Sequence, residues 1–457
     1  MRRRDFLAAA AASTLTTVPA WAAQRTRRPN FLLIVADDLG WADVGCYGRD
    51  DVKTPAIDSL ARSGMKFEHA YANSCVCTPT RVALMTGQYQ HRLPIGLEEP
   101  LGAADVGIES SEPTLPAQLR AAGYQTSLVG KWHLGSADRF SPLKVGYQHF
   151  WGVRGGGTDY FKHTLRREAD AKSDLWDGDV RVDEVGYMTD LLGKHATDEV
   201  TRMAASPDPF LLSLHFTAPH WPWEGPKDQA VSATLTDFMH HDGGTIATYR
   251  AMIESMDSNI ARVLAALEKS GKARDTLVVF TSDNGGERFS KTWPFNGMKA
   301  ELLEGGIRVP LIARWPGRIR PRSVTQQTAM TMDFLPTLLE AANVTPDASK
   351  PSDGMSLLST FREPDRVQER SLFWRYRSHA QAAARRGNYK YLRMEGTEYL
   401  FDVVADPQER GNLSKKQPAV FEELKAAWAS WNSQMLPYSE KNATWDNKST
   451  HALPDRY

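Results

Sequence analysis

Short apolar runs rich in Leu, Ile and Val recur along this chain, with amphipathic helical patterns between them. Runs that are apolar at nearly every position are typical of strands buried on both faces of a parallel sheet. Their alternation with helices predicts an α/β domain over residues 24–345, with a large, mostly parallel sheet flanked by helices. The predicted strands are 31–36, 126–130, 210–216, 277–282 and 309–313.

Two of the intervening helices have clear ends. Residues 114–122 are followed by Gly123 and residues 247–270 by Gly271, and glycine readily takes the left-handed conformation that ends a helix. The longer helix has one apolar face, which we expect to lie against the sheet. That face consists of Ile253, Met256, Ile260, Val263, Leu264 and Leu267.

The pattern changes after residue 345, where a polar connection with several prolines begins. Short strand-like runs and one helical stretch follow it, which predicts a smaller C-terminal α+β subdomain over residues 360–435. Residues 436–457 have little periodicity and are predicted to form a tail. The predicted elements of the subdomain are strands at 370–374, 389–393 and 398–403 and a helix around 421–431.

The charge balance excludes some classes of partner. The chain of 457 residues has 55 basic and 55 acidic side chains. A balance of this kind indicates neither a basic nucleic-acid-binding surface nor a long acidic tail. We therefore expect no nucleic-acid partner.

The first 22 residues have the features of an export signal in the usual order. Arg2, Arg3 and Arg4 precede Phe6-Leu7, an alanine-rich run follows, and Ala20-Trp21-Ala22 resembles an A-x-A cleavage site. The order predicts a twin-arginine signal peptide over residues 1–22, the alternative being a disordered basic tail. The apolar run is too short to cross a membrane. We expect export by the bacterial Tat machinery to a periplasmic or secreted location, with no membrane attachment in the mature form.

Polar side chains follow two of the predicted strands directly. Asp37 and Asp38 follow the first strand, and Asp283 and Asn284 follow strand 277–282. In open α/β sheets, ligands bind outside the carboxyl ends of the strands. Carboxylate and amide oxygens suit Ca²⁺ or Mg²⁺ and suit zinc poorly. Each pair alone would more often form a turn, but two such pairs together favour a metal site.

Cationic and imidazole side chains follow two further strands. Lys131 and His133 come after strand 126–130, and His220 comes after strand 210–216. Each residue alone would more often be a solvated or a packed side chain. Cations beside a metal site indicate an anionic ligand.

The stretch Ser74-Cys75-Val76-Cys77-Thr78-Pro79 leads into a predicted helix with Thr78 as N-cap, Pro79 at its first position and Gly87 at its end. Cys77 thus precedes a helix N-terminus, which favours a negatively charged group. No second cysteine pair completes a zinc site, whereas an activated thiolate is physically possible. The third cysteine is Cys46, and its pairing with Cys75 is left open.

The run from Cys77-Thr78-Pro79-Thr80-Arg81 to Leu84-Met85-Thr86-Gly87 resembles the C-x-P-x-R…L-x-T-G signature of the type I, formylglycine-dependent sulfatases of the alkaline phosphatase superfamily. Thr80 stands where serine is most common in that signature. The resemblance covers residues 29–413 and implies an alkaline phosphatase-like fold and sulfuric ester hydrolase activity. Further blocks that match in order are Asp37-Asp38-Leu39-Gly40, Gly130-Lys131-Trp132-His133-Leu134-Gly135, Ala218-Pro219-His220, Ser282-Asp283-Asn284-Gly285, Gly297-Met298-Lys299, Glu304-Gly305-Gly306-Ile307-Arg308-Val309-Pro310, Leu400-Phe401-Asp402 and Asp406-Pro407.

The resemblance also implies residue roles. Cys77 would be oxidised to Cα-formylglycine by a formylglycine-generating maturase, and its hydrate would be the nucleophile toward sulfur. His220, with Lys299, would protonate the leaving oxygen, and His133 would accept a proton from the hydrate. Arg81, Lys131 and Lys299 would hold the formylglycine and the sulfate oxygens. One Ca²⁺ would be bound by Asp37, Asp38, Asp283 and Asn284, with the modified Cys77 next to it.

The substrate is the least determined feature. We expect a sulfated small molecule or glycan, with a sulfated carbohydrate favoured over an aryl sulfate. Tyr160, His163 and Trp221 are candidates for the substrate pocket, because aromatic rings stack on sugars, although such rings more often fill a core. Two other functions stay open: a phosphodiester or phosphonate monoester hydrolase of the same superfamily, and an inactive sulfate-binding relative in which Cys77 stays a thiol.

Overall fold

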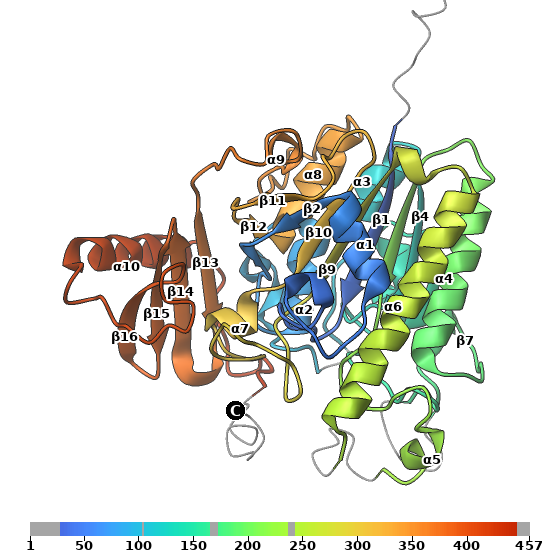
Figure 1. Cartoon of the computed structure of the whole chain (residues 1–457), viewed down its shortest axis with the longest axis horizontal. Helices are drawn as coiled ribbons and strands as arrows, with labels where there is room; N and C mark the ends of the chain where they lie inside the picture. Colours follow the sequence, from blue (N-terminus) through green and yellow to red (C-terminus); the bar gives the residue numbers. More distant parts are fainter. Residues whose placement is uncertain (1–27, 103–104, 165–171, 236–242, 446–457) are drawn as a thin grey trace, which may run out of the picture.

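The computed structural model describes residues 28–102, 105–164, 172–235 and 243–445. The predicted signal peptide (1–22) and residues 446–457 of the predicted tail lie outside these described residues. The described chain forms a large mixed sheet covered by helices and a small antiparallel sheet beside it (Figure 1). The predicted α/β fold with a smaller C-terminal α+β part is confirmed, while the predicted boundary at residue 345 stays a prediction.

The large sheet has a parallel centre. β1 (Asn30–Ala36) lies between β8 (Phe210–His215) and β9 (Thr276–Ser282) and is parallel to both, and β4 (Gln125–Lys131) is parallel to β8. β10 (Leu311–Arg314) runs antiparallel to β9. The full strand order is β11-β2-β10-β9-β1-β8-β4-β5-β6-β7, with β2 Met65–Phe67, β5 His149–Val153, β6 Leu175–Asp177, β7 Val180–Arg181 and β11 Ser323–Thr325.

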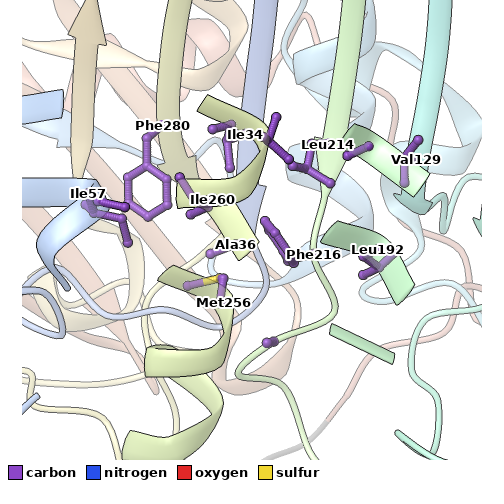
Figure 2. Close-up of a cluster of buried hydrophobic side chains, with 14 of the residues drawn as sticks. Ile34, Ala36, Ile57, Val129, Leu192, Leu214, Phe216, Met256, Ile260 and Phe280 are labelled. Atoms are coloured by element: carbon purple, nitrogen blue, oxygen red, sulfur yellow. The ribbon is translucent and has the colours of Figure 1, made fainter. Parts of the chain in front are cut away.

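Both faces of the central strands are buried, as their uniformly apolar sequences predict. Leu32, Ile34 and Ala36 of β1 belong to one hydrophobic cluster, whereas Phe31, Leu33 and Val35 belong to another. Figure 2 shows the first cluster, in which side chains from four strands meet side chains from α1, α4 and α6. The sheet is therefore the middle layer of three, and its edges are the places left for polar chemistry.

The helices follow the sequence pattern closely. α3 (Leu115–Ala121) is capped by the Thr114 hydroxyl, which accepts a hydrogen bond from the Ala117 amide at 3.3 Å. α6 (Ile246–Lys269) is followed by Gly271 at φ 71°. No helix of the described residues is both long enough and apolar enough to cross a membrane. The remaining helices are α1 Pro55–Ser63, α2 Cys77–Thr86, α4 Met188–Ala204, α5 Gln229–Ser232, α7 Glu304–Ile307, α8 Phe334–Ala341, α9 Leu358–Arg362 and α10 Pro418–Asn432.

The small sheet has the order β13-β14-β15-β16 and carries α10. Its second strand, Gln381–Arg386, was not predicted, because its Gln-Ala-Ala-Ala-Arg-Arg sequence contains good helix formers. Tertiary packing overrides that preference, since Ala382, Ala383 and Ala384 are fully buried between neighbouring strands. The other strands are β13 Ser371–Tyr376, β15 Tyr389–Met394 and β16 Thr397–Asp402, and a separate parallel pair is formed by β3 Ala70–Tyr71 and β12 Ala329–Met330.

The small sheet is packed onto the segment that carries the cysteines. Its residues share a hydrophobic cluster with Cys75 and Val76, and the Trp374 indole donates a hydrogen bond to the Ala72 carbonyl at 2.8 Å. Cys75 is thus a small packing residue. Cys46, Cys75 and Cys77 are all free thiols, so the pairing of Cys46 with Cys75 is not formed.

Candidate functional site

The acidic residues predicted at two strand ends are brought together. β1 and β9 are aligned so that Ala36 faces Ser282, and the residues that follow both strands therefore meet. The Asp38 amide donates to Asp283 Oδ1 at 3.3 Å, and the Asn284 side-chain amide donates to Asp38 Oδ1 at 2.7 Å. Asp38 takes a left-handed conformation, at φ 63°, to make these contacts.

Each of the three carboxylates is paired with one of the predicted cations. Lys131 Nζ lies 2.6 Å from Asp37 Oδ2, and Lys299 Nζ lies 2.6 Å from Asp38 Oδ2. Arg81 Nη2 lies 2.7 Å from Asp283 Oδ2. All six side chains are buried. Buried charges are tolerated only when they are paired, so these residues form one interdependent cluster.

The carboxyl groups of Asp37 and Asp283 differ in the direction of their pKa shifts. Burial raises the pKa of Asp37 well above its ordinary value, despite the opposing charges of Lys131 and Arg81. Burial acts in the same direction on Asp283, but the guanidinium of Arg81 lowers the pKa of Asp283 below its ordinary value. The positive charges of Lys131 and Arg81 therefore offset only part of the cost of burying the Asp37 carboxylate.

The donor set fits a hard divalent cation. Asp37 Oδ1 and Asn284 Oδ1 are buried and have no hydrogen-bond partner among the described residues. Asp37, Asp38 and His220 each offer a ligand atom, and these atoms lie within 4.8 Å of one another. Carboxylate and amide oxygens suit Ca²⁺, and a cation there would favour the charged form of Asp37, whose pKa is raised by burial.

Helix α2 begins at Cys77, so the prediction of Thr78 as its N-cap is wrong. The Thr78 hydroxyl instead accepts a hydrogen bond from the Leu101 amide at 3.0 Å. Thr80 closes the turn before the helix, because its hydroxyl accepts from the Ser74 amide at 3.0 Å and donates to the Ser74 carbonyl at 3.2 Å. A serine hydroxyl makes the same two bonds, which explains how threonine replaces serine in this motif.

Cys77 is buried within the cluster. Burial raises the pKa of its thiol, although the nearby Lys131 and Lys299 ammonium groups act to lower it. This raised pKa disfavours the activated thiolate that is physically possible at this position. An unmodified thiol would be mainly neutral and a poor nucleophile.

The two predicted histidines are both buried beside the cluster. His220 Nδ1 bonds the Trp221 carbonyl at 2.6 Å, and its Nε2 lies 3.6 Å from Asp38 Oδ2. His133, at φ 55°, bonds the Leu101 carbonyl through Nε2 at 3.3 Å. Burial, followed by the neighbouring lysine ammonium groups, lowers the pKa of both imidazoles well below the ordinary value.

Two further buried ionisable residues complete the site and were not predicted. His215 Nδ1 lies 3.4 Å from Arg81 Nη1 and 3.2 Å from the Lys131 carbonyl. His215 ends an apolar strand, so nothing in the sequence distinguishes it from a core residue. Glu287 is buried near Lys299, and burial raises its pKa to about 7. Its only sequence signal is its closeness to Asp283-Asn284.

Two of the three predicted pocket residues are buried, and the third is partly exposed. Tyr160 is fully buried, and its hydroxyl donates to the carbonyls of Thr217 at 2.8 Å and His220 at 2.9 Å. His163 is 2% exposed and its Nε2 bonds the Gly186 carbonyl at 3.1 Å. Tyr160 therefore positions the His220 loop from behind. Trp221 is partly exposed, with the Lys299 Nζ 5.7 Å from its ring centroid.

Comparisons with known proteins show the family to which the chain is similar. Residues 29–344 match the family model described as Sulfatase, and residues 298–433 match the model described as N-sulphoglucosamine sulphohydrolase, C-terminal. Steryl-sulfatase of Mus musculus is 32% identical and covers 82% of this chain and 72% of its own length. N-acetylgalactosamine-6-sulfatase of Sus scrofa is 33% identical, and the match covers 79% of this chain and 71% of the relative's length. The crystal structure of Ps i-CgsB in complex with k-i-k-neocarrahexaose has a TM-score of 0.82 and 28% identity, and covers 93% of this chain and 96% of its own.

Proposed function

Because the chain belongs to the sulfatase family of sulfuric ester hydrolases, we propose that it removes sulfate from a sulfated carbohydrate by means of a formylglycine made from Cys77 and one Ca²⁺. The observation that carries this proposal is the set of three buried carboxylate–cation pairs around Cys77. Three cations in one buried cluster favour an anionic group, and the acidic residues favour a divalent metal ion. The two together suit an ester with a negatively charged sulfate.

The two added groups supply what the chain lacks. The neutral Cys77 thiol is a poor nucleophile. Formylglycine in its hydrated form would supply a hydroxyl group as the nucleophile instead. Ca²⁺, held by Asp37, Asp38, Asp283 and Asn284, supplies a Lewis acid that polarises oxygen atoms.

The surrounding side chains have separate tasks. Arg81 holds Asp283 through Nε and Nη2, at 3.0 and 2.7 Å, and so fixes the acidic cluster relative to helix α2. Lys131 and Lys299 place positive charge next to Cys77, where the sulfate oxygens would lie. His220 donates Nδ1–H to the Trp221 carbonyl, which leaves Nε2 facing the cluster. As an imidazolium, the form that a bound anionic ester would favour, it would protonate the leaving oxygen from Nε2. His133 is our candidate for removing a proton on the other side.

Support for a carbohydrate substrate comes from the relatives. Ps i-CgsB is described in complex with k-i-k-neocarrahexaose, and another relative is named as an N-acetylgalactosamine-6-sulfatase. The steryl-sulfatase relative keeps a non-carbohydrate ester as an alternative. The arginine-rich start of the sequence supports export through the Tat machinery to the periplasm or beyond, after a maturase has modified Cys77.

The test is the parallel measurement of hydrolysis rates on a sulfated oligosaccharide, an aryl sulfate, a phosphodiester and a phosphonate monoester. The protein is produced together with a formylglycine-generating maturase, and the mass of the tryptic peptide of residues 67–81 is measured by mass spectrometry. We expect sulfur to be replaced by oxygen in this peptide and sulfate esters to react fastest. Dominant phosphonate or phosphodiester hydrolysis would contradict the proposal, and an unmodified, inactive protein would indicate a sulfate-binding relative. Cys77→Ala is the matched inactive control.

A further inference from the structure

The described chain does not end at α10. Residues 436–445, which we call the return segment, leave this helix and run back to the large domain. The Leu436 amide donates to the His91 carbonyl at 3.0 Å. Further on, the Glu99 amide donates to the Ala443 carbonyl at 3.0 Å and the Trp445 amide donates to the Glu99 carbonyl at 2.6 Å. The return segment thus pairs with the chain around Glu99 in the manner of a short parallel strand.

Side chains fix this pairing from both sides. The Glu98 carboxylate accepts hydrogen bonds from the Asn442 side chain at 2.8 Å and from the Ala443 amide at 3.0 Å. The Tyr438 hydroxyl donates to the buried carboxyl group of Glu99. The Trp445 carbonyl accepts from the Tyr376 hydroxyl at 2.8 Å. These bonds fix the backbone that carries the Trp445 indole.

The residues that hold the return segment also contact the catalytic cluster. Leu101 lies two positions after Glu99, and its amide donates to the hydroxyl of Thr78, the neighbour of Cys77, at 3.0 Å. The Leu101 carbonyl is the partner of His133 Nε2 at 3.3 Å. Residues 99–101 therefore have the return segment on one side and the start of helix α2 on the other.

The indole of Trp445 reaches the cluster itself. The Lys299 Nζ lies 5.3 Å from the Trp445 ring centroid and 5.7 Å from that of Trp221, while it also bonds Asp38. The Trp221 ring is 4.2 Å from that of His220, the proposed acid. Both indoles are only partly buried. Two aromatic rings thus flank the ammonium group on the side where the leaving oxygen would be protonated.

We infer that the return segment completes the substrate-binding site and that Trp445, with Trp221, forms a pair of aromatic walls for the ring of the leaving alcohol. This inference rests on the proposed function. Partly exposed indole faces bind the apolar face of a pyranose or a similar ring, and the sulfate then meets Lys299 between them. The ligand class is therefore a sulfate ester of a ring-bearing alcohol, and Trp445 is a specificity-determining residue.

The test compares Trp445→Ala and Trp445→Phe with Trp315→Ala in the matured enzyme. Trp315 is a matched control because it is also partly buried beside a cation, with Arg318 5.8 Å from its ring centroid. Trp315 follows β10, which runs antiparallel to β9, so it lies at the edge of the sheet opposite the cluster.

For Trp445→Ala we expect kcat/KM on a sulfated oligosaccharide to fall about tenfold, the effect of losing one ring contact. The inhibition constant of inorganic sulfate, which has no ring, should change by less than about twofold. Trp445→Phe and Trp315→Ala should retain most of kcat/KM. An unchanged kcat/KM in Trp445→Ala, or an equal loss of oligosaccharide turnover and sulfate binding, would overturn the inference. A wild-type enzyme that releases no sulfate would overturn the proposed function instead.

Discussion

The backbone of Gly156 approaches the His133 imidazole so closely that a β-carbon added to the glycine would lie 2.3 Å from Nε2. That same Nε2 bonds the Leu101 carbonyl at 3.3 Å. The ring is therefore held between a carbonyl oxygen and a bare glycine backbone, and its position depends on the absence of a side chain at residue 156.

Gly156→Ala should displace the His133 ring and lower kcat more than it raises KM. A displaced proton-transfer group commonly costs about 10²-fold in rate. Steady-state kinetics on one sulfate ester measures this effect. Gly102→Ala is the control, since no described atom would lie within 4 Å of a β-carbon there. An equal loss in both variants would mean that the effect is general loosening of the loops.

Asp283→Asn should remove bound calcium and activity together. The variant removes the carboxylate that bonds Arg81 and leaves it only the more distant Asp37, 3.8 Å away. Breaking a buried ion pair in this way costs about 3–5 kcal/mol of stability. Elemental analysis gives the metal content, and urea unfolding gives the stability. Asp333→Asn, which breaks the Arg370–Asp333 pair away from the cluster, should lose stability but keep calcium. Normal metal content in Asp283→Asn would contradict the ligand assignment.

Tyr160→Phe should lower kcat by about tenfold while the protein stays folded, because the His220 loop loses the hydroxyl that bonds two of its carbonyls. Tyr147→Phe is the matched control, since its buried hydroxyl donates to Ser213 Oγ at 2.8 Å in the core. The two variants should lose similar stability in thermal unfolding and differ in kcat. If kcat falls equally in both, Tyr160 has no special role.

The pH dependence of stability should include a contribution from His69. Burial, followed by the charges of Arg308 and Arg385, lowers the pKa of His69 to about 3. Between this value and about 6.5 the unfolded chain binds a proton that the folded chain does not, so stability falls as the pH drops through this range. Urea unfolding from pH 4 to 7 measures the slope. His69→Asn should flatten it by up to about one proton, and an unchanged slope would contradict the assignment.

The metal cluster could be predicted because its residues are local in sequence. Asp37-Asp38 and Asp283-Asn284 follow uniformly apolar strands, and parallel neighbours bring such strand ends together. The same reasoning places Lys131 and His220 at that edge. The start of α2 was misplaced by two residues, because Thr78 and Pro79 favour an N-cap and a first helical position, whereas the helix begins at Cys77 and the Thr78 hydroxyl bonds the Leu101 amide.

What could not be predicted depends on contacts between distant segments. The position of Trp445 follows from pairing with Glu99, and the tail sequence has no periodic pattern that reports this pairing. β14 has an alanine-rich sequence that is typical of helices, and only its burial between β13 and β15 makes it a strand. Tyr160 was assigned to a pocket surface because a residue type alone does not show which way a loop folds.

The pairing of Glu98 with Ala443 also has a consequence for the order of events during synthesis. These residues are 345 positions apart. A ribosome must therefore add 345 further residues after Glu98 before the return segment can pair with it. Until then residues 99–101, which contact the start of α2 through the Leu101 amide and the Thr78 hydroxyl, lack this partner. The fold beside Cys77 is thus completed only long after Cys77 itself has been translated.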